Sequence, residues 1–403
     1  MSKNSMTSRR SWLKQGALLA GGLVSAPALL PKVQARPAFG MTPYRGTYSL
    51  TEYHMAPPDF SKITVRLLAN ENPYGPSPKA IKAIGESASK GNRYVYSSSR
   101  KMEEMLAEKE GVKPENILLG PGSTDLLEKT AIVRCMNGGN VISAEPAYMS
   151  LVNTSRAVGA TWKNIPLTAD YAHDLDAMAS AVDDETKLVY ICNPNNPTGT
   201  ITSSEDIMAF GRKVADKTPV FIDEAYIELA MDPKVTSAVG LVKEGKDVII
   251  ARTFSKLHGM AGLRIGYMVA QPERIKSIKD MVRTEMGISV TSMEGAMASL
   301  ADTEFQEKTM TLNQECREYT MGELKGMGFE PYPSYTSFIL FPVDMPTDKL
   351  MYAMVDKGIG IRTYNINDQP YCRVSMGTMD EMKQFTTALA QVFDKSTVQA
   401  GGK

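Results

Sequence analysis

KLVYICNPNNPTG, residues Lys187 to Gly199, joins a short apolar run to a turn that contains two prolines and a glycine. An apolar run of this length that stops at turn residues is typical of a strand buried inside a sheet. The prolines and Gly199 restrict the chain to a rigid turn, which leaves the amide of Asn196 just beyond the strand. The stretch therefore predicts a buried strand with a polar group at its carboxyl end.

The same arrangement recurs along the chain. Amphipathic segments with a helical period, such as Ser204 to Asp216, lie between the apolar runs. Strands that alternate with helices predict a largely parallel sheet that is covered on both faces. We therefore expect an α/β fold with a three-layer α/β/α large domain. The other apolar runs that we interpret as strands are Ile117–Leu119, Asn140–Ile142, Val220–Ile222 and Asp247–Ala251.

After about Thr303 the pattern changes to that of a smaller α+β domain. A long helical segment at 305–327 leads to a strand at 336–341, a helix at 348–357, strands at 359–364 and 371–375, and a last helix from Met379. We expect the segment before Pro76 to pack on this domain or on a neighbouring subunit. The predicted boundaries are 1–35 for a targeting segment, 36–75 for an arm, 76–300 for the large domain and 301–397 for the small domain.

In parallel sheets of this kind, ligands bind beyond the carboxyl ends of the strands. Lys256 follows one predicted strand, and a lysine amine can hold an aldehyde cofactor as a Schiff base. Arg264, eight residues later, is a fixed cation suited to a phosphate group. A lysine and an arginine at this spacing are also common as plain surface residues.

Asp223 ends another predicted strand, where a buried carboxylate needs a partner. The protonated nitrogen of a pyridine ring would serve, and Tyr226 could then reach the phenolic oxygen of that ring, as could Asn196. The simpler alternative is that Asp223 caps the following helix.

Gly120-Pro121-Gly122-Ser123-Thr124-Asp125 precedes an apolar helical segment. Free backbone N–H groups at the start of a helix, together with the hydroxyls of Ser123 and Thr124, form an anion site. Tyr148 follows the next predicted strand and could stack on an aromatic ring. Each of these signals is ambiguous when it is taken alone.

Taken in order, the motifs GSTD, PAY, NPNNPTG, DEAY, SK and GLR resemble those of the fold-type-I, pyridoxal-phosphate-dependent aminotransferases, over about residues 69–392. ANENPYGP, DEAYIE and CRVSMGT resemble the histidinol-phosphate aminotransferase branch in particular. The resemblance implies pyridoxal 5'-phosphate as the cofactor, and it assigns a role to each matching residue. Lys256 would be the Schiff-base lysine, Asp223 the partner of the ring nitrogen, Asn196 and Tyr226 the partners of the phenolic oxygen, Tyr148 the stacking residue, Ser123, Thr124, Ser255 and Arg264 the phosphate site, Arg373 and Asn72 the substrate site, and Tyr94 a contact to the other subunit's cofactor.

The chain departs from the family pattern in three places. Arg93-Tyr94-Val95-Tyr96 replaces the usual R-Y-P-D, which weakens the role implied for Tyr94. His258 stands where an apolar or aromatic residue is more usual, and it either packs in the core or touches the substrate. The segment from Pro37 to Val65 has no clear counterpart, and it either covers the active site or forms an interface arm.

The first 35 residues contain Thr7-Ser8-Arg9-Arg10-Ser11-Trp12-Leu13-Lys14 ahead of a mild apolar run. The stretch resembles a twin-arginine export signal, with cleavage expected after Ala35. The apolar run is shorter than the roughly 20 residues that cross a bilayer, so we do not expect a membrane anchor. Because the twin-arginine machinery exports folded proteins, we expect a periplasmic or exported enzyme that receives its cofactor before export.

The composition argues against a nucleic-acid partner and against a metal site. The 403 residues carry no net formal charge, so there is no electrostatic reason to expect nucleic acid as a partner. None of the four cysteines forms a C-x-x-C pair and the three histidines are scattered, which argues against a metal site. We expect free, mostly buried thiols.

The leading hypothesis is transfer of an amino group from an amino acid or related amine to a keto acid, by a homodimer with shared active sites. Lys256 would serve as the general base. An exported location argues against histidinol phosphate as the substrate, since its phosphate should keep it in the cytoplasm. An oxidase, deaminase or lyase on the same fold needs no external amino acceptor and is the alternative. A non-catalytic cofactor-binding regulator is a third, weaker possibility.

Overall fold

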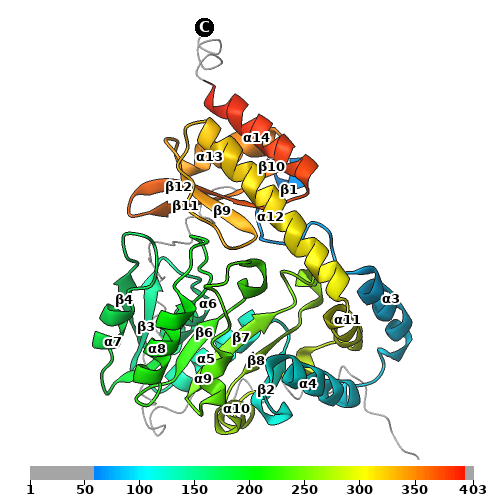
Figure 1. Ribbon diagram of the computed structural model, residues 1–403, viewed down its shortest axis with the longest axis vertical. Coiled ribbons are helices and arrows are strands. Elements are labelled where there is room, and N and C mark those ends of the chain that lie inside the picture. The colour runs from blue at the N-terminus through cyan, green and yellow to red at the C-terminus, as the bar shows by residue number, and fades with distance from the viewer. Residues whose placement is uncertain (1–58, 395–403) are drawn as a thin grey trace, which may run out of the picture. The chain divides into compact units, whose positions relative to one another are not determined.

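The computed structural model describes residues 59–394 (Figure 1). The predicted export signal, and the predicted arm up to residue 58, lie outside the described residues. The α-helices are α3 (Pro78–Ser87), α4 (Tyr96–Glu110), α5 (Ser123–Cys135), α6 (Ser150–Ala157), α7 (Leu175–Ser180), α8 (Ser204–Val214), α9 (Val239–Lys243), α10 (Pro272–Lys279), α11 (Val290–Leu300), α12 (Thr303–Gly326), α13 (Thr347–Asp356) and α14 (Met379–Phe393).

The strands are β1 (Val65–Arg66), β2 (Ile117–Gly120), β3 (Asn140–Glu145), β4 (Thr161–Pro166), β5 (Thr186–Cys192), β6 (Val220–Asp223), β7 (Val248–Thr253), β8 (Gly266–Val269), β9 (Phe338–Pro342), β10 (Ile359–Gly360), β11 (Arg362–Ile366) and β12 (Gln369–Ser375). Short 3-10 helices are η1 (Phe60–Lys62), η2 (Ala88–Lys90), η3 (Pro114–Asn116), η4 (Ile227–Leu229), η5 (Ala261–Leu263) and η6 (Glu285–Gly287).

Within the described residues, seven strands form the main sheet in the order β2-β8-β7-β6-β5-β3-β4. The pairs from β7 through β6, β5 and β3 to β4 are parallel, whereas β8 is antiparallel to both β7 and β2. In register, Cys192 at the end of β5 lies beside Asp223, and Asp223 lies beside Ala251 on β7. The carboxyl ends of these neighbouring strands therefore meet at one edge of the sheet.

Alternate residues of the central strands face two separate apolar layers. Ile222 and Ile250 pack into a core that includes side chains of α4, α8 and α11, whereas Phe221 and Ile249 pack against α5, α6 and α10. Successive side chains of a strand point to opposite faces, so a strand buried on both sides is apolar at nearly every position. The sheet is thus covered on both faces, which confirms the predicted three-layer α/β fold.

A second core lies around the antiparallel sheet β11-β12-β9, covered by α12, α13 and α14 (Figure 1). Residues 65–67 belong to this core, because β1 pairs with β10 and Val65 and Leu67 are buried there. Beyond Leu67 the chain continues toward α3, so it passes between the two cores. This path brings Asn70 and Asn72 into hydrogen bonds with Tyr226 and Leu257, which follow β6 and β7.

Two strands of the main sheet were not anticipated, namely β4 and β8. β4 lies at the edge of the sheet and is largely exposed, so it lacks the apolar run that marks a buried strand. β8 has four residues and follows a glycine-rich loop, which hides it from periodicity. The predicted stretch 359–364 is two strands, β10 and β11, separated at Ile361.

All four cysteines are buried and carry free thiols. Among residues 59–394, no helix is both long and apolar enough to cross a membrane.

Candidate active site

A pocket of about 540 Å³ opens at the carboxyl edge of the main sheet. It collects residues from the ends of β2, β3, β5, β6 and β7, together with strands β11 and β12 of the second core. Ten of the twelve residues predicted from the sequence line it. These are Ser123, Thr124, Tyr148, Asn196, Asp223, Tyr226, Ser255, Lys256, Arg264 and Arg373.

Asp223 is the last residue of β6 and is 3% exposed. Its carboxylate accepts hydrogen bonds from the backbone N–H of Ala225 (3.2 Å) and from the hydroxyl of Tyr190 (3.4 Å). Burial raises the pKa of Asp223 to about 6, against these two donors and nearby Lys256. No Lys, Arg or His within residues 59–394 forms an ion pair with it. A cationic group of a ligand in the pocket could therefore form an ion pair with the buried Asp223 carboxylate.

Lys256 lies three residues beyond the end of β7. Its Nζ donates to the backbone carbonyl of Asn70 (2.9 Å) and lies 5.2 Å from the centre of the Tyr226 ring. Burial and the nearby guanidinium of Arg373 lower the pKa of Lys256 to about 8, although Asp223 acts in the opposite direction. The amine is thus available as a nucleophile and a base near neutral pH.

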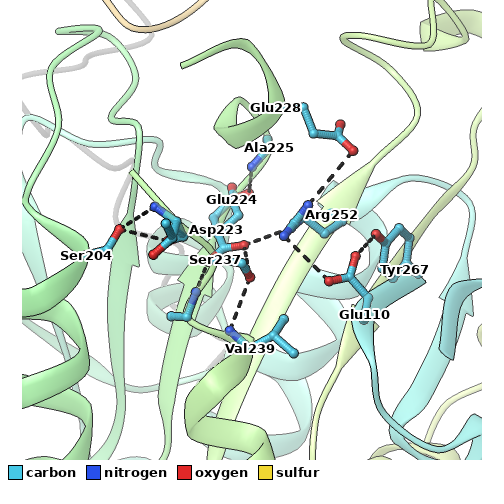
Figure 2. A network of polar contacts seen from close by, with 12 residues as sticks. Glu110, Ser204, Asp223, Glu224, Ala225, Glu228, Ser237, Val239, Arg252 and Tyr267 are labelled. Atoms are coloured by element: carbon cyan, nitrogen blue, oxygen red, sulfur yellow. Dashed lines mark hydrogen bonds and ion pairs between the residues drawn. The ribbon is translucent and has the colours of Figure 1, made fainter. Parts of the chain in front are cut away.

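A buried charge network adjoins Asp223 near the carboxyl ends of β6 and β7 (Figure 2). Arg252 of β7 pairs with Glu224, the residue after Asp223, at 2.8 Å, and lies 3.7 Å from Glu110 and 3.9 Å from Glu228. Glu224 also accepts from the hydroxyl of Ser237 and from the backbone of Ala238. The network joins Glu224, directly after β6, to Arg252 near the end of β7.

The start of α5 and the loop before β8 form a cradle at one end of the pocket. Gly122 has φ of +92°, and a side chain there would clash with the Arg264 guanidinium. Arg264 donates to the carbonyls of Ala261 (2.9 Å) and Pro121 (3.2 Å). A fixed guanidinium, a helix N-terminus and the hydroxyl of Ser123 together suit a phosphate group.

Arg373 reaches the pocket from β12 and is 3% exposed. Its guanidinium donates to Asn196 Oδ1 (2.7 Å) and lies over the rings of Phe338 and Tyr364, at 5.1 and 5.3 Å. Its buried Nε–H has no hydrogen-bond partner among the described residues. A buried cation with a spare donor is suited to an anionic group of a ligand.

Two predicted residues do not line this pocket. The side chain of Asn72 instead donates to the Leu257 carbonyl (2.8 Å) and accepts from the backbone of Tyr74. Tyr94 is 71% exposed and borders a separate pocket formed by residues 91–99 and 285–291. His258 is buried against Phe254 and accepts from or donates to Ser299 at 2.8 Å, so it packs outside the pocket.

The residues expected at the site from the sequence did not include Asn70, Tyr364 or Arg362. All three line the pocket. Arg362 on β11 lies opposite Arg373 on β12 in the antiparallel register. The alternation of buried and exposed side chains along the two strands could have suggested this register. The described residues contain no cluster of His, Cys, Asp or Glu side chains that could hold a metal ion.

Comparison with known proteins agrees with this geometry. Residues 62–389 match the family described as Aminotransferase class I and II. The chain is 36% identical over 331 residues to a histidinol-phosphate aminotransferase of Desulfotalea psychrophila, a match that covers 81% of this chain and 87% of that protein. It is 35% identical to histidinol-phosphate aminotransferase 2 of Haemophilus influenzae, over 86% of this chain and 97% of that protein.

A solved structure gives the same result. The crystal structure of histidinol-phosphate aminotransferase from Sinorhizobium meliloti in complex with pyridoxal-5'-phosphate is 27% identical, with a TM-score of 0.78, and the match covers 89% of this chain and 97% of that chain. The chain therefore belongs to the class I and II aminotransferase family. Within that family it falls in the histidinol-phosphate aminotransferase branch of the fold-type-I enzymes.

Proposed function

We propose that this chain transfers an amino group from an amine with an anionic substituent to a keto acid, with pyridoxal 5'-phosphate held by Lys256. The observation that carries the proposal is the convergence of Lys256, Asp223 and Arg373 on one pocket, from the loop after β7, the end of β6 and β12 respectively. The pocket thus offers a nucleophilic amine, a buried carboxylate and a buried cation to a single ligand.

The residues present fit this cofactor. Asp223 matches the ring nitrogen, because it is a buried carboxylate with no ion-pair partner among residues 59–394. The start of α5 and Arg264 match the phosphate, because a helix N-terminus, the Ser123 hydroxyl and a guanidinium border the same pocket. The hydroxyl of Tyr226 and the amide of Asn196 match the phenolic oxygen, and Tyr148 lies at the pocket wall for stacking.

When bound, the cofactor supplies an electron-withdrawing ring that stabilises the carbanion formed at the substrate's α-carbon. Asp223 would keep the ring nitrogen protonated, which requires that its carboxylate stay charged. The free amine of Lys256 would act as the base that removes the proton from the α-carbon and as the acid that gives it back to the cofactor. Arg373 holds the anionic substituent and so fixes which bond of the α-carbon faces Lys256.

The test is to mix purified, cofactor-loaded protein with a panel of amino acids and amines that includes histidinol phosphate, and to identify the products. A keto acid together with the amino form of the cofactor supports the proposal. Hydrogen peroxide with ammonia would indicate an oxidase, and ammonia alone would indicate elimination; either outcome overturns aminotransfer.

We also propose that the protein is exported in folded form by the twin-arginine machinery. Arg9 and Arg10 ahead of a weakly apolar segment support this, and both lie outside the described residues. Replacement of both by lysine should retain the precursor in the cytoplasm with its cofactor bound. Unchanged export of that variant would overturn the proposal.

We further propose a homodimer with shared active sites. The exposed side chains of Tyr94, Tyr96 and Met286 beside the second pocket support a contact with another copy of the chain. Inactive Tyr94→Ala and Lys256→Ala variants, once mixed and allowed to exchange subunits, should regain part of the activity, because each mixed dimer has one intact site. No recovery in a mixture shown to contain mixed dimers would contradict shared sites.

A further inference from the structure

Asn70 occupies the point where the two cores and the pocket meet. It is 2% exposed, it lines the pocket, and it lies on the segment between β1 and α3. Its φ of +52° is in the left-handed region, which asparagine tolerates better than most residues. This backbone conformation directs its carbonyl to Lys256, whose Nζ donates to it at 2.9 Å.

The side chain of Asn70 is held in one orientation by Ser375. The Ser375 hydroxyl donates to Asn70 Oδ1 (2.7 Å), and the same hydroxyl oxygen accepts from the backbone N–H of Asn70 (2.8 Å). The amide cannot be reversed without losing the first of these bonds, because a hydroxyl that donates needs an acceptor. The Nδ2 group must therefore face the other way, where it donates to the Tyr226 hydroxyl at 3.0 Å.

This contact decides where the proton of Tyr226 points. A phenol has one hydrogen and two lone pairs, and the Asn70 N–H uses a lone pair. The phenol hydrogen is left to be donated in another direction. Burial raises the pKa of Tyr226, so the hydroxyl keeps that hydrogen at neutral pH, although Arg373 and Asn70 act in the opposite direction.

We propose that Asn70 is a positioning residue for the transfer reaction, a role that rests on the proposed function. Its side-chain amide turns the Tyr226 hydroxyl toward the phenolic oxygen of the cofactor, and its carbonyl holds the Lys256 amine when that amine is free. Ser375 lies two residues beyond Arg373 on β12. Its hydrogen bonds to Asn70 therefore link Asn70, and through it Tyr226, to the strand that carries Arg373.

The test uses Asn70→Gly, Asn70→Asp and Ser375→Ala, with Asn116→Gly as the control. Glycine keeps the left-handed backbone and the carbonyl but removes the amide. Aspartate keeps the shape, but its carboxylate accepts a hydrogen bond from the Tyr226 hydroxyl, whereas the asparagine amide donates one. Asn116 is a half-buried asparagine outside the pocket, whose Nδ2 donates to the Ala270 carbonyl (2.8 Å), so its variant reports general loosening of the fold.

The readout is the pH midpoint of the visible absorbance of the cofactor-loaded enzyme, together with the affinity of the cofactor-free chain for pyridoxal 5'-phosphate. A hydroxyl that donates to the phenolic oxygen stabilises its charged form, so misdirecting the hydroxyl should raise the midpoint. We expect Asn70→Gly to raise it by about half a pH unit to one unit, a 3- to 10-fold change in the protonation equilibrium. Asn70→Asp should shift it further, Ser375→Ala less, and Asn116→Gly not at all.

A second measurement separates positioning from a structural role. In a Tyr226→Phe background the Asn70→Gly shift should disappear, because the group that Asn70 orients is gone. A shift that persists there, or an unshifted midpoint in both Asn70 variants, overturns the inference. Failure of the proposed function itself would show differently, as a wild-type protein that neither binds the cofactor nor transfers amino groups.

Discussion

The two walls of the pocket are built in different ways. The wall at the main sheet consists of strand ends, and the Arg252 network holds them in a dry interior. The opposite wall consists of residues 68–70 and strands β11 and β12, joined by hydrogen bonds between segments some 300 residues apart. We infer that the sheet wall determines cofactor binding and chemistry, whereas the second wall determines which substrate is held and how it is aligned.

The largest effect should come from the sheet wall at Lys256. Lys256→Ala removes both the general base and the covalent attachment point, so we expect turnover to fall by at least about 10⁴-fold. Borohydride treatment of the wild type should fix the cofactor onto Lys256, as peptide mapping by mass spectrometry would show. Fixation of the cofactor at another lysine would mean that the assignment of this wall is wrong.

The next effect tests how that wall is held. Arg252→Met leaves the buried carboxylates of Glu224 and Glu110 without their cation, so we expect the free energy of unfolding to fall by about 3–5 kcal/mol. Chemical denaturation of the cofactor-free protein measures this. Lys276→Met is the control, because its partner Asp280 forms an exposed pair at 2.6 Å that should contribute less than about 1 kcal/mol. Equal losses in the two variants would contradict a supporting role for the network.

A smaller and more selective effect is expected on the second wall. Arg373→Lys keeps the charge but loses the paired geometry of a guanidinium, so kcat/KM should fall about 10- to 1000-fold while the cofactor stays bound. Arg264→Lys on the sheet wall should show the reverse, with weakened cofactor retention. Steady-state kinetics and the visible spectrum distinguish the two. If Arg373→Lys releases the cofactor instead, the two walls do not have the separate roles that we infer. Arg362 then becomes the better candidate for binding the anionic group of the substrate.

The same division explains what could be predicted from the sequence. Asp223 ends β6, and Asn196 and Lys256 follow the ends of β5 and β7 within a few residues, so local pattern and the geometry of a parallel sheet place them together. Asn70 offers no such signal. The motif Asn70-Glu71-Asn72 contains two asparagines, and only the left-handed turn at Asn70 and its bond to Ser375 turn that one into the pocket. Contacts across so long a separation cannot be read from local periodicity.

The smallest predicted effect is a pH dependence of the free energy of unfolding, which involves Lys256 on one wall and Arg373 on the other. The pKa of Lys256 is lowered to about 8 by burial and by Arg373, compared with about 10.5 in the unfolded chain.

Between these two pH values the unfolded state binds more protons than the folded state, so the cofactor-free protein should gain stability as pH rises from about 8 to 10.5. Below pH 8 both states are protonated, and the full penalty of a charged, largely desolvated amine remains. We expect a gain of no more than about 2 kcal/mol relative to Lys256→Met, since part of the shift is screened by solvent.

Denaturation of wild type and Lys256→Met in parallel at several pH values isolates this contribution from all other titrating groups. Arg373→Gln should raise the lower limit of the pH range over which stability increases, and should make the total increase smaller. The reason is that it removes a positive charge that opposes protonation of Lys256. An unchanged pH range in Arg373→Gln would mean that the Arg373 charge has no effect on the pKa of Lys256, and that burial alone lowers it. A shift of this pH range would show that Arg373, the proposed substrate-binding residue, also lowers the pKa of Lys256, the proposed base on the opposite wall.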